Sequence, residues 1–571
     1  MTEPQQNTFT FTKCGCQCPV QYDDNGNMQP LFIPDITQIP LDCTRTWDLL
    51  GQGNTQGVFQ LESRLGSSLA KKLKPRSIEH LAALVSIMRP GCLNAMRKDE
   101  GENAKMKSVA QHYIDRKNGV ETVTYFHPAL QNALEPTYGE MVYQEQAMQI
   151  ARDIAGFDLQ QADILRKAIG KKKPEIMAKV KKDFLQGCQT AQIVNQEQAE
   201  AIFSWIEKSQ RYSFNKSHAV AYAVNAYLAA YVKAHFPRAF FTSYLYYAHN
   251  KPKPREEIYR LVTNAKNMGI DVLPYDIRHN NDHFSVINKN IYFGLIDIKN
   301  IGGTAMKTIH KQLELAQQTL HKPIPEWQWL DFLLFCSTNI PSQSVISLIC
   351  TGALDYFKYD RLRMYYEFEQ LRLLTKKELQ WLQNRYISDA TTTPIYIDLK
   401  PLLKILVDSP TGRKGCANPK RQQKVTAIYE ALMNPPYSLK DSKIWIAGVE
   451  KQLLGVSLTC TEVDECNKDM ANCTCQQFQA GYKVPGPYLI AVNITEVIPW
   501  KIKSGKSKGR EMAFLRVADT TGGLDSVVIF TDKWSQYKNL LVTNNTVIIS
   551  GSRNKNKNDA DGFLIDTAWQ I

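Results

Sequence analysis

The sequence contains no hydrophobic run long enough to cross a bilayer. Its most apolar stretch, Ala219 to Val232, is shorter than the roughly 20 residues that a membrane helix needs, and it contains Asn225. Met1 to Thr10 is polar, unlike the apolar core of a secretory signal. We therefore expect a cytoplasmic protein with no membrane partner.

The thirteen cysteines do not follow the usual C-x2-C spacing of zinc sites. In a reducing compartment they are expected to be free thiols or metal ligands rather than disulfides. Cys14, Cys16 and Cys18 follow a C-x-C-x-C pattern, which fits either a metal knuckle or a reduced, partly ordered arm. A second group forms a candidate zinc site without histidine: Cys460, Cys466, Cys473 and Cys475.

A pattern of catalytic carboxylates is also missing. The D-x-D sequence Asp559-Ala560-Asp561 lies in a polar loop and is more typical of a turn. Ser217-His218 has no accompanying acid or oxyanion pattern, so nucleophilic catalysis is not indicated. We assign no catalytic residue to this chain.

The composition is that of a folded protein with an anionic partner. The 571 residues are 43% apolar and 10% aromatic, which predicts two to four domains. The 69 Lys and Arg exceed the 56 Asp and Glu by 13 charges. A basic excess of this size favours a polyanion such as a nucleic acid.

Residues 158–184 predict two helices joined by a basic turn. Asp158 and Gln161 are placed to cap the first helix, Gly170 suits its end, and Pro174 can begin the second. The turn region carries five cations within eight residues: Arg166, Lys167, Lys171, Lys172 and Lys173. They fit a phosphate site or a solvated basic face, and charge alone favours the solvated face.

A second polar turn precedes the apolar stretch. Asn215, Lys216, Ser217 and His218 lead into a helix that is apolar on nearly all sides, so we expect it to be buried. Such a helix start offers free backbone N–H groups and its positive dipole end to an anion.

Five segments together resemble a known family. They are GVFQLES (57–63), RPG (89–91), YQEQ (143–146), ADILRKAIGKKKPE (162–175) and FNKSHAVAYA (214–223). In sequence, order and spacing they resemble the fingers of the bacterial DNA polymerase III alpha subunit, a C-family replicative polymerase. The resemblance runs from about residue 39 to the C-terminus and is weakest over 357–484. Residues 1–38 have no recognised counterpart, and Cys92 replaces a proline that family members have after RPG.

The resemblance implies a DNA-dependent DNA polymerase subunit, a nucleotidyltransferase that acts on dNTPs and primer-template DNA in a bacterial or phage-infected cytoplasm. The residues it implies for dNTP binding are Arg166, Lys167, Lys171, Asn215, Lys216, Ser217 and His218. The family usually has arginine at the position of Lys167, which puts bidentate phosphate contact there in doubt. Arg89 is expected either to touch substrate or template or to hold its turn.

The later part of the chain resembles DNA-holding regions of the same family. Residues 298–303 resemble a helix-hairpin-helix turn, which implies that Lys299, Gly302 and Gly303 contact phosphates without reading sequence. Residues 370–374 resemble a sliding-clamp-binding peptide, although the same spacing of apolar residues is more typical of an ordinary amphipathic helix. Residues 485–571 contain four β-rich runs and resemble a single-strand-binding OB fold.

The barrel's expected DNA contacts lie in a basic hairpin loop and on nearby aromatic residues. They are Lys503, Lys506, Lys508, Arg510 and Phe514. Phe530 and Trp534 are further candidate stacking platforms, and any of these aromatic side chains fits a core position as well.

We expect a multidomain α+β fold that is mostly helical, with an all-β barrel at its end. The expected parts are a Cys-containing segment (1–38), fingers (39–275), a helix-hairpin-helix duplex- and clamp-binding domain (276–384), an irregular linker with the Cys cluster (385–484) and the OB fold (485–571).

In the family, palm aspartates hold the catalytic Mg²⁺ ions, and they lie upstream of the fingers. We expect a palm-bearing partner chain to supply them, which makes this chain one part of a split polymerase; either a divided phage or bacterial gene or a cloned fragment explains this. The alternative is a non-catalytic DNA- or sliding-clamp-binding protein built from polymerase parts.

Overall fold

The computed structural model describes residues 8–22, 27–98, 106–171, 174–209, 213–390, 398–408, 419–502, 505, 507–554 and 562–571. The chain divides into two compact units, residues 1–237 (unit 1) and 238–571 (unit 2). In the described parts, no helix combines the length and the apolar character that spanning a bilayer needs. The predicted fold class is confirmed: most of the chain is helical, and a closed barrel ends it.

Unit 1 is helical apart from short strands. Its elements are β1 (Thr8–Thr10), β2 (Gln17–Tyr22), β3 (Met28–Pro30), α1 (Thr44–Gly51), α2 (Arg64–Leu73), α3 (Ile78–Ile87), α4 (Pro90–Asn94), β4 (Met96–Lys98), β5 (Met106–Ser108), α5 (Val109–Lys117), α6 (Gln131–Leu134), α7 (Gln144–Ala155), α8 (Leu159–Lys171), α9 (Pro174–Ala191), α10 (Gln196–Ser209) and α11 (Lys216–His235). Helix α11 packs against α3 and α1.

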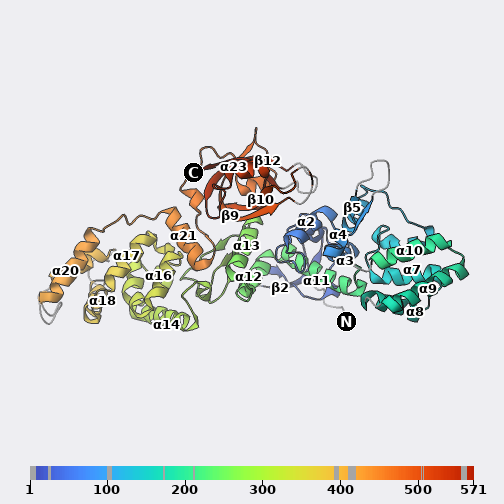
Figure 1. Cartoon of the computed structure of the whole chain (residues 1–571). Helices are drawn as coiled ribbons and strands as arrows, with labels where there is room; N and C mark the ends of the chain where they lie inside the picture. The colour runs from blue at the N-terminus through green and yellow to red at the C-terminus, as the bar shows by residue number, and fades with distance from the viewer. Residues whose placement is uncertain are drawn as a thin grey trace, which may run out of the picture. The chain divides into compact units, whose positions relative to one another are not determined.

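Helices α7 to α10 gather into one cluster (Figure 1). Their shared core includes Ile150, Leu165 and Phe203, all fully buried. The predicted start of α8 is confirmed: Asp158 N–H donates to Gln161 Oε1 at 3.0 Å, and Gln161 N–H donates to Asp158 Oδ1 at 2.8 Å. Helix α8 runs through the glycine expected to end it and stops at residue 171, and Pro174 begins α9 as predicted.

The described part of the N-terminal segment is folded. Strands β1, β2 and β3 form an antiparallel sheet in that order. The Phe11 ring lies 4.3 Å from the His235 ring, and the Phe32 ring lies 5.7 Å from that of Phe236, measured between centroids. The sheet is therefore held against the C-terminal end of α11, so the expectation of a partly ordered arm is wrong for these residues.

Residues 93–122 are rich in charged side chains, and two of their arginines belong to a buried ionic cluster around Glu140. Glu140 is 1% exposed and accepts a hydrogen bond from Arg97, and Arg116 lies 3.4 Å from it. Arg116 Nε also donates to Glu121 at 2.7 Å. Because Glu140 lies 43 residues from Arg97, a local pattern of charges does not reveal this cluster.

Unit 2 begins with helices and ends with the barrel. Its elements are α12 (Pro237–Ala248), α13 (Pro254–Asn267), β6 (Val272–Leu273), β7 (Ser285–Ile287), β8 (Asn290–Tyr292), α14 (Gly303–Leu320), α15 (Trp329–Phe335), α16 (Ser342–Cys350), α17 (Arg361–Leu371), α18 (Lys376–Ala390), α19 (Leu399–Asp408), α20 (Pro419–Met433), α21 (Lys443–Leu454), α22 (Cys475–Gln479), β9 (Tyr488–Lys501), β10 (Glu511–Asp519), β11 (Gly522–Ile529), α23 (Thr531–Tyr537), β12 (Thr546–Arg553) and β13 (Phe563–Gln570). The region 385–484, expected to be irregular, thus contains α19, α20, α21 and α22.

The barrel closes in the order β10-β11-β13-β12-β9. Its pairs are antiparallel except β11 with β13, which is parallel. The sequence predicts only four of these strands and misses β13. Gly522 and Gly523, a pair more typical of a turn between strands, are the first residues of β11.

A buried ionic cluster ties α17 to α21 in unit 2. Arg361 is 2% exposed, and its guanidinium donates to Glu450 Oε1 at 2.8 Å and to Asp355 Oδ2 at 2.7 Å. Glu450, which is fully buried, also accepts the backbone N–H of Leu458 at 2.6 Å. The cluster fixes the chain that leads from α21 towards the barrel.

Replacing Arg361 by methionine should lower the free energy of unfolding of unit 2 by about 3–5 kcal/mol, because Glu450 would stay buried without its cation. Urea denaturation followed by tryptophan fluorescence measures this, since seven of the nine tryptophans lie in unit 2. The exposed pair Lys404–Asp408 provides the control, and K404A should leave the stability nearly unchanged. A loss below 1 kcal/mol for R361M would contradict this account.

Candidate functional site

The start of α11 is tied to the start of α7. Asn215 caps α11: its Oδ1 accepts the His218 N–H at 2.9 Å and the Ser217 hydroxyl at 2.6 Å. Glu145, in the first turn of α7, accepts from Asn215 Nδ2 at 3.0 Å and from the Lys216 N–H at 2.9 Å. Four predicted site residues, Asn215 to His218, therefore form one hydrogen-bonded turn.

This turn has fewer free backbone donors than expected. The N–H groups of Lys216 and His218 are already taken, the first by Glu145 and the second by Asn215. Helix α11 is also less buried than its composition suggests, since Asn225 and the residues from Lys216 to His218 are exposed. A ligand at this turn would meet exposed side chains rather than an unoccupied helix end.

Aromatic rings and one guanidinium surround the turn. The Arg89 guanidinium carbon lies 3.8 Å from the centroid of the Phe214 ring. The His218 ring lies 4.0 Å from Tyr222, which in turn lies 5.1 Å from Phe59. Phe59 is 40% exposed. Sequence analysis did not single out this aromatic group, although its members come from the segments that carry the family resemblance.

Helix α8 carries two of the predicted cations. Arg166 donates to Asp163 Oδ1 at 2.8 Å, and Lys167 Nζ lies 2.7 Å from Asp163 Oδ2. Both hydrogen bonds lower the pKa of Asp163, and the one from Lys167 has the larger effect. Arg166 and Lys167 remain 36% and 57% exposed. The side chains of Lys171, Lys172 and Lys173 lie outside the described residues.

The predicted helix-hairpin-helix turn is exposed on unit 2. Lys299, Gly302 and Gly303 are all exposed, and Gly302 caps α14 with an ordinary φ of −91°. A Cβ added at either glycine would meet no atom within 4 Å. Since nothing inside the chain requires glycine here, the two positions suit close approach by an outside molecule.

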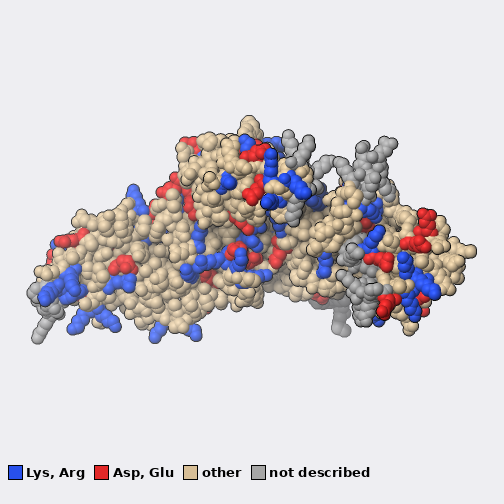
Figure 2. All heavy atoms as spheres, in the orientation of Figure 1, with Lys and Arg blue, Asp and Glu red and all other residues tan. Residues whose placement is uncertain are grey.

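Basic side chains collect near the same region. Figure 2 shows Lys and Arg along one edge of unit 2, over α14, α18 and α20. Exposed cations of these helices include Lys307, Lys311, Lys376, Lys377, Lys420 and Lys424. Such an edge attracts a phosphate backbone without selecting a base sequence.

The barrel places its predicted contacts differently. Phe514 is half-buried, and its ring centroid lies 6.5 Å from that of Trp500, which is 45% exposed. Phe530 is 50% exposed, whereas Trp534 is buried and belongs to the barrel core. Lys508 and Arg510 are exposed, and Lys503 and Lys506 lie outside the described residues. The sequence analysis overlooked Trp500.

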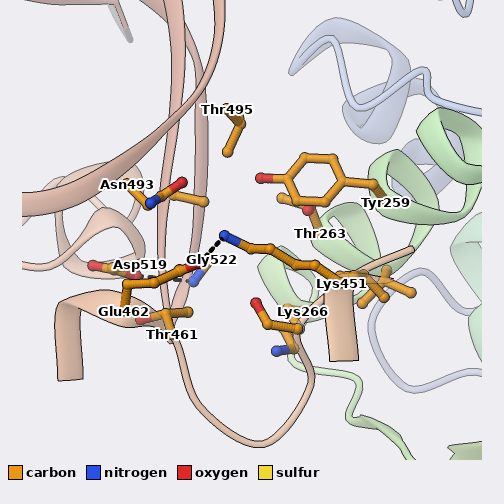
Figure 3. A pocket seen from close by; sticks show the side chains of 14 residues that line it. Tyr259, Thr263, Lys266, Lys451, Thr461, Glu462, Asn493, Thr495, Asp519 and Gly522 are labelled. Carbon is orange, nitrogen blue, oxygen red and sulfur yellow. Dashed lines mark hydrogen bonds and ion pairs between the residues drawn. The ribbon is translucent and has the colours of Figure 1, made fainter. Parts of the chain in front are cut away.

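A polar pocket lies where α13 meets the barrel (Figure 3). Tyr259 and Lys266 of α13 line it together with Asn493 and Thr495 of β9. Burial lowers the pKa of Lys266. Helix α13 thus covers one end of the β9–β10 ribbon, while Trp500 and Phe514 lie towards the other end.

The resemblance to a clamp-binding peptide meets a structural obstacle. Leu371, the last residue of α17, is fully buried, and Leu374 is 7% exposed. Leu373 is the exposed apolar side chain of this segment. Two of the side chains that would insert into a groove on the clamp are therefore part of the chain's own core, as expected of an amphipathic helix.

The four C-terminal cysteines are engaged separately. The thiols of Cys460, Cys466 and Cys473 donate to carbonyl oxygens at 3.3 to 3.4 Å, and Cys475 is fully buried. Within the described residues, the group of ligand atoms close enough to share a metal ion is a different one, Cys14, Cys16, Cys43 and His235.

Replacing Glu145 by alanine should loosen the start of α11, because the Lys216 N–H and the Asn215 amide lose their acceptor. We expect a loss of about 1–3 kcal/mol and faster amide exchange over residues 213–220, measured by hydrogen-exchange mass spectrometry. E145Q keeps one acceptor oxygen and should lie in between. E197A, in the exposed first turn of α10, should leave residues 213–220 unchanged. Unchanged protection in E145A would rule out this role.

Comparisons with known proteins agree with this arrangement. The family description of the bacterial DNA polymerase III alpha subunit finger domain matches residues 32–192, and that of a helix-hairpin-helix motif matches residues 269–364. The DNA polymerase III subunit alpha of Thermus aquaticus is 31% identical over 508 residues, which are 86% of this chain and 36% of the relative.

Two further relatives carry the same name. The protein of Borreliella burgdorferi is 30% identical over 521 residues, 90% of this chain and 40% of the relative. That of Escherichia coli K12 is 39% identical over 281 residues, 48% of this chain and 23% of the relative. The chain thus spans between 23% and 40% of the length of these curated relatives. These matches confirm the resemblance: the chain belongs to the family of the bacterial DNA polymerase III alpha subunit and corresponds to a C-terminal region with fingers and a helix-hairpin-helix motif.

Proposed function

We propose that this chain is the fingers-bearing part of a C-family replicative DNA polymerase. It binds the incoming dNTP and grips primer-template DNA, while a palm-bearing partner chain supplies the carboxylates that hold the Mg²⁺ ions. The observation that carries the proposal is the turn at the start of α11. There, residues from four of the five family segments, Phe59, Arg89, Glu145 and the run from Phe214 to Tyr222, lie in one connected cluster.

In the nucleotide site, the cations of α8 would bind the triphosphate, and the turn at the start of α11 would position the nucleotide. Arg166 and Lys167 are exposed cations, and Asp163 holds both in one place. A triphosphate attracts both of them. The turn from Asn215 to His218 presents an amide, an ammonium, a hydroxyl and an imidazole on a helix start that Glu145 fixes. These groups orient a nucleotide but supply no metal ligand set of their own.

The DNA grip would come from unit 2. Lys299, Gly302 and Gly303 offer one cation and two unobstructed backbone positions for duplex phosphates. Trp500, Phe514 and Phe530 offer stacking surfaces for single-stranded bases, with Lys508 and Arg510 nearby in sequence. A sliding clamp remains a candidate partner, although the segment 370–374 offers little exposed apolar surface for it.

Primer extension with Mg²⁺ and dNTPs tests the proposal, using this chain alone, a palm-bearing chain encoded next to it alone, and both together. We expect synthesis only in the mixture. Synthesis by this chain alone would show that it holds metal carboxylates of its own. DNA binding without synthesis in any mixture would favour the alternative, a non-catalytic DNA- or clamp-binding protein.

In the active mixture, Arg166→Ala should lower kcat/KM for dNTP by about 100-fold or more, because a charge that stabilises the triphosphate is lost. R166K keeps the charge without the bidentate fork and should be intermediate. R152A removes an exposed cation from α7 and should have no effect. Wild-type kinetics in R166A would remove this residue from the nucleotide site.

Alanine at Gly302 and Gly303 tests the duplex contact. The double variant should bind a primer-template duplex about tenfold more weakly, because a phosphate could no longer approach the backbone, and a hydrogen bond to a charged group contributes about 1.5–3 kcal/mol. Fluorescence anisotropy at a fixed salt concentration measures the affinity.

The matched control is Gly448→Ala in α21, another exposed glycine whose added Cβ would meet no atom within 4 Å. Neither variant should lose thermal stability, so weaker binding cannot be attributed to unfolding. Equal affinity of the G302A/G303A variant and the parent chain would exclude these glycines from the DNA contact.

A further inference from the structure

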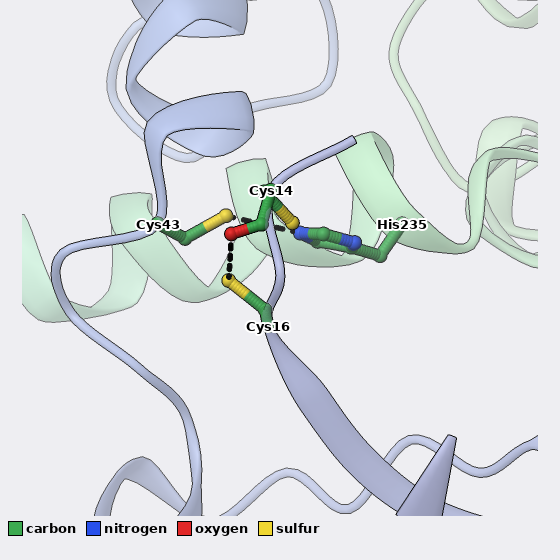
Figure 4. Close-up of side chains that lie close together, drawn as sticks. All are labelled: Cys14, Cys16, Cys43 and His235. Atoms are coloured by element: carbon green, nitrogen blue, oxygen red, sulfur yellow. Dashed lines mark hydrogen bonds between the residues drawn. The ribbon is translucent and has the colours of Figure 1, made fainter. Parts of the chain in front are cut away.

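Three thiols and one imidazole converge in unit 1 (Figure 4). They belong to Cys14, Cys16, Cys43 and His235, and one ligand atom from each lies within 4.8 Å of all the others. Cys43 immediately precedes α1, and His235 is the last residue of α11. The four side chains thus join three parts of the chain that are remote in sequence.

The backbone arranges the first two thiols. The Phe11 carbonyl accepts the N–H groups of Cys14 at 3.3 Å and of Gly15 at 2.8 Å, and the Phe11 N–H donates to the Cys16 carbonyl at 2.9 Å. Gly15 has a φ of +70°, which glycine adopts without strain. This tight turn directs Cys14 and Cys16 towards the same point, where both face Cys43 and His235 (Figure 4).

The surroundings are those of an enclosed site. Cys43 is 1% exposed and His235 is 7% exposed. The rings of Phe11 and Tyr231 each lie 4.3 Å from the imidazole. Cys43 Sγ lies 3.2 Å from His235 Nε2. A neutral imidazole keeps the lone pair that a metal ion needs.

We propose that Cys14, Cys16, Cys43 and His235 bind a structural Zn²⁺ ion. Three sulfur ligands and one nitrogen ligand form a set that tetrahedral zinc prefers. With Zn–S bonds of about 2.3 Å, tetrahedral ligand atoms stand roughly 3.7 Å apart, so the observed spacing needs only small shifts to accept the ion.

The chemistry of binding is balanced by proton release. Each thiol ligates as a thiolate, so three protons leave to solvent when Zn²⁺ enters, and His235 Nε2 contributes its lone pair without losing a proton. The resulting group carries one net negative charge. Arg45, two residues after Cys43 in the sequence, is a cation that would offset part of this charge.

The ion would fasten the N-terminal segment to α11. Cys14 and Cys16 lie before residue 32, where the match to the finger family begins, so this fastening is an addition to the finger region. The same helix bears the candidate nucleotide-binding turn at its other end. Zinc would therefore fix one end of the helix whose opposite end is proposed to face the nucleotide.

Cys18 is the natural control. Sequence spacing groups it with Cys14 and Cys16, but it lies in β2 opposite Phe9 and outside the four-residue group. The thiol of Cys473, in the C-terminal cysteine group, provides a second control because it donates to a carbonyl in unit 2.

The test is the metal content of the full chain, purified under reducing conditions without a metal-affinity tag and measured by inductively coupled plasma mass spectrometry. We expect about one zinc per chain, and the loss of most of it in the C14S/C16S double variant. C18S and C473S should retain zinc. Zinc K-edge absorption spectroscopy of the parent should show three sulfur neighbours and one nitrogen neighbour.

Cobalt provides a measurement that does not depend on the folding of a variant. Reduced, metal-free parent chain titrated with Co²⁺ should develop the absorption bands of tetrahedral cobalt thiolate, and added Zn²⁺ should abolish them. The absence of both stoichiometric zinc and cobalt thiolate bands would overturn the proposal, and so would zinc that persists in C14S/C16S. Both readouts are independent of DNA synthesis, so they separate this proposal from the polymerase function.

Discussion

A single carboxylate organises the site in unit 1. Glu145 lies in the first turn of α7 and accepts two hydrogen bonds from the start of α11. The positive ends of two helix dipoles therefore share one negative charge. A short parallel bridge between Tyr143 and Phe214 lies beside this contact and places the Phe214 ring under Arg89. The positions of His218 and Tyr222 follow from the resulting direction of α11, which brings Tyr222 against Phe59.

Local features of the fold could be predicted because their interactions lie within a few residues. Asp158 and Gln161 are three residues apart and form the reciprocal cap that the sequence indicates. Four barrel strands are apparent for the same reason, since their apolar runs are local. Strand β13 was missed because the adjacent Asp566 and Thr567 interrupt its apolar residues, and because its parallel partner β11 lies far away in sequence.

The rest of the site depends on contacts that a single sequence does not reveal. Glu145 and Asn215 are 70 residues apart, and Cys43 and His235 are 192 apart. Spacing alone groups Cys14 and Cys16 with Cys18, although their neighbours in space are Cys43 and His235. Charges mislead in the same way: Arg116 and Glu140 come from different segments of the chain, yet the fold buries both of them together.

The pairing of Asp163 with Arg166 and Lys167 has a consequence for ligand choice. A ligand that takes over these two cations must first displace a carboxylate that already neutralises part of their charge. A phosphodiester of the DNA backbone carries one negative charge, as Asp163 does, and gains little from the exchange. A triphosphate carries several negative charges and gains much more. At the proposed nucleotide site, Asp163 would act as an internal counter-ion that favours a ligand of high charge density over a single phosphodiester.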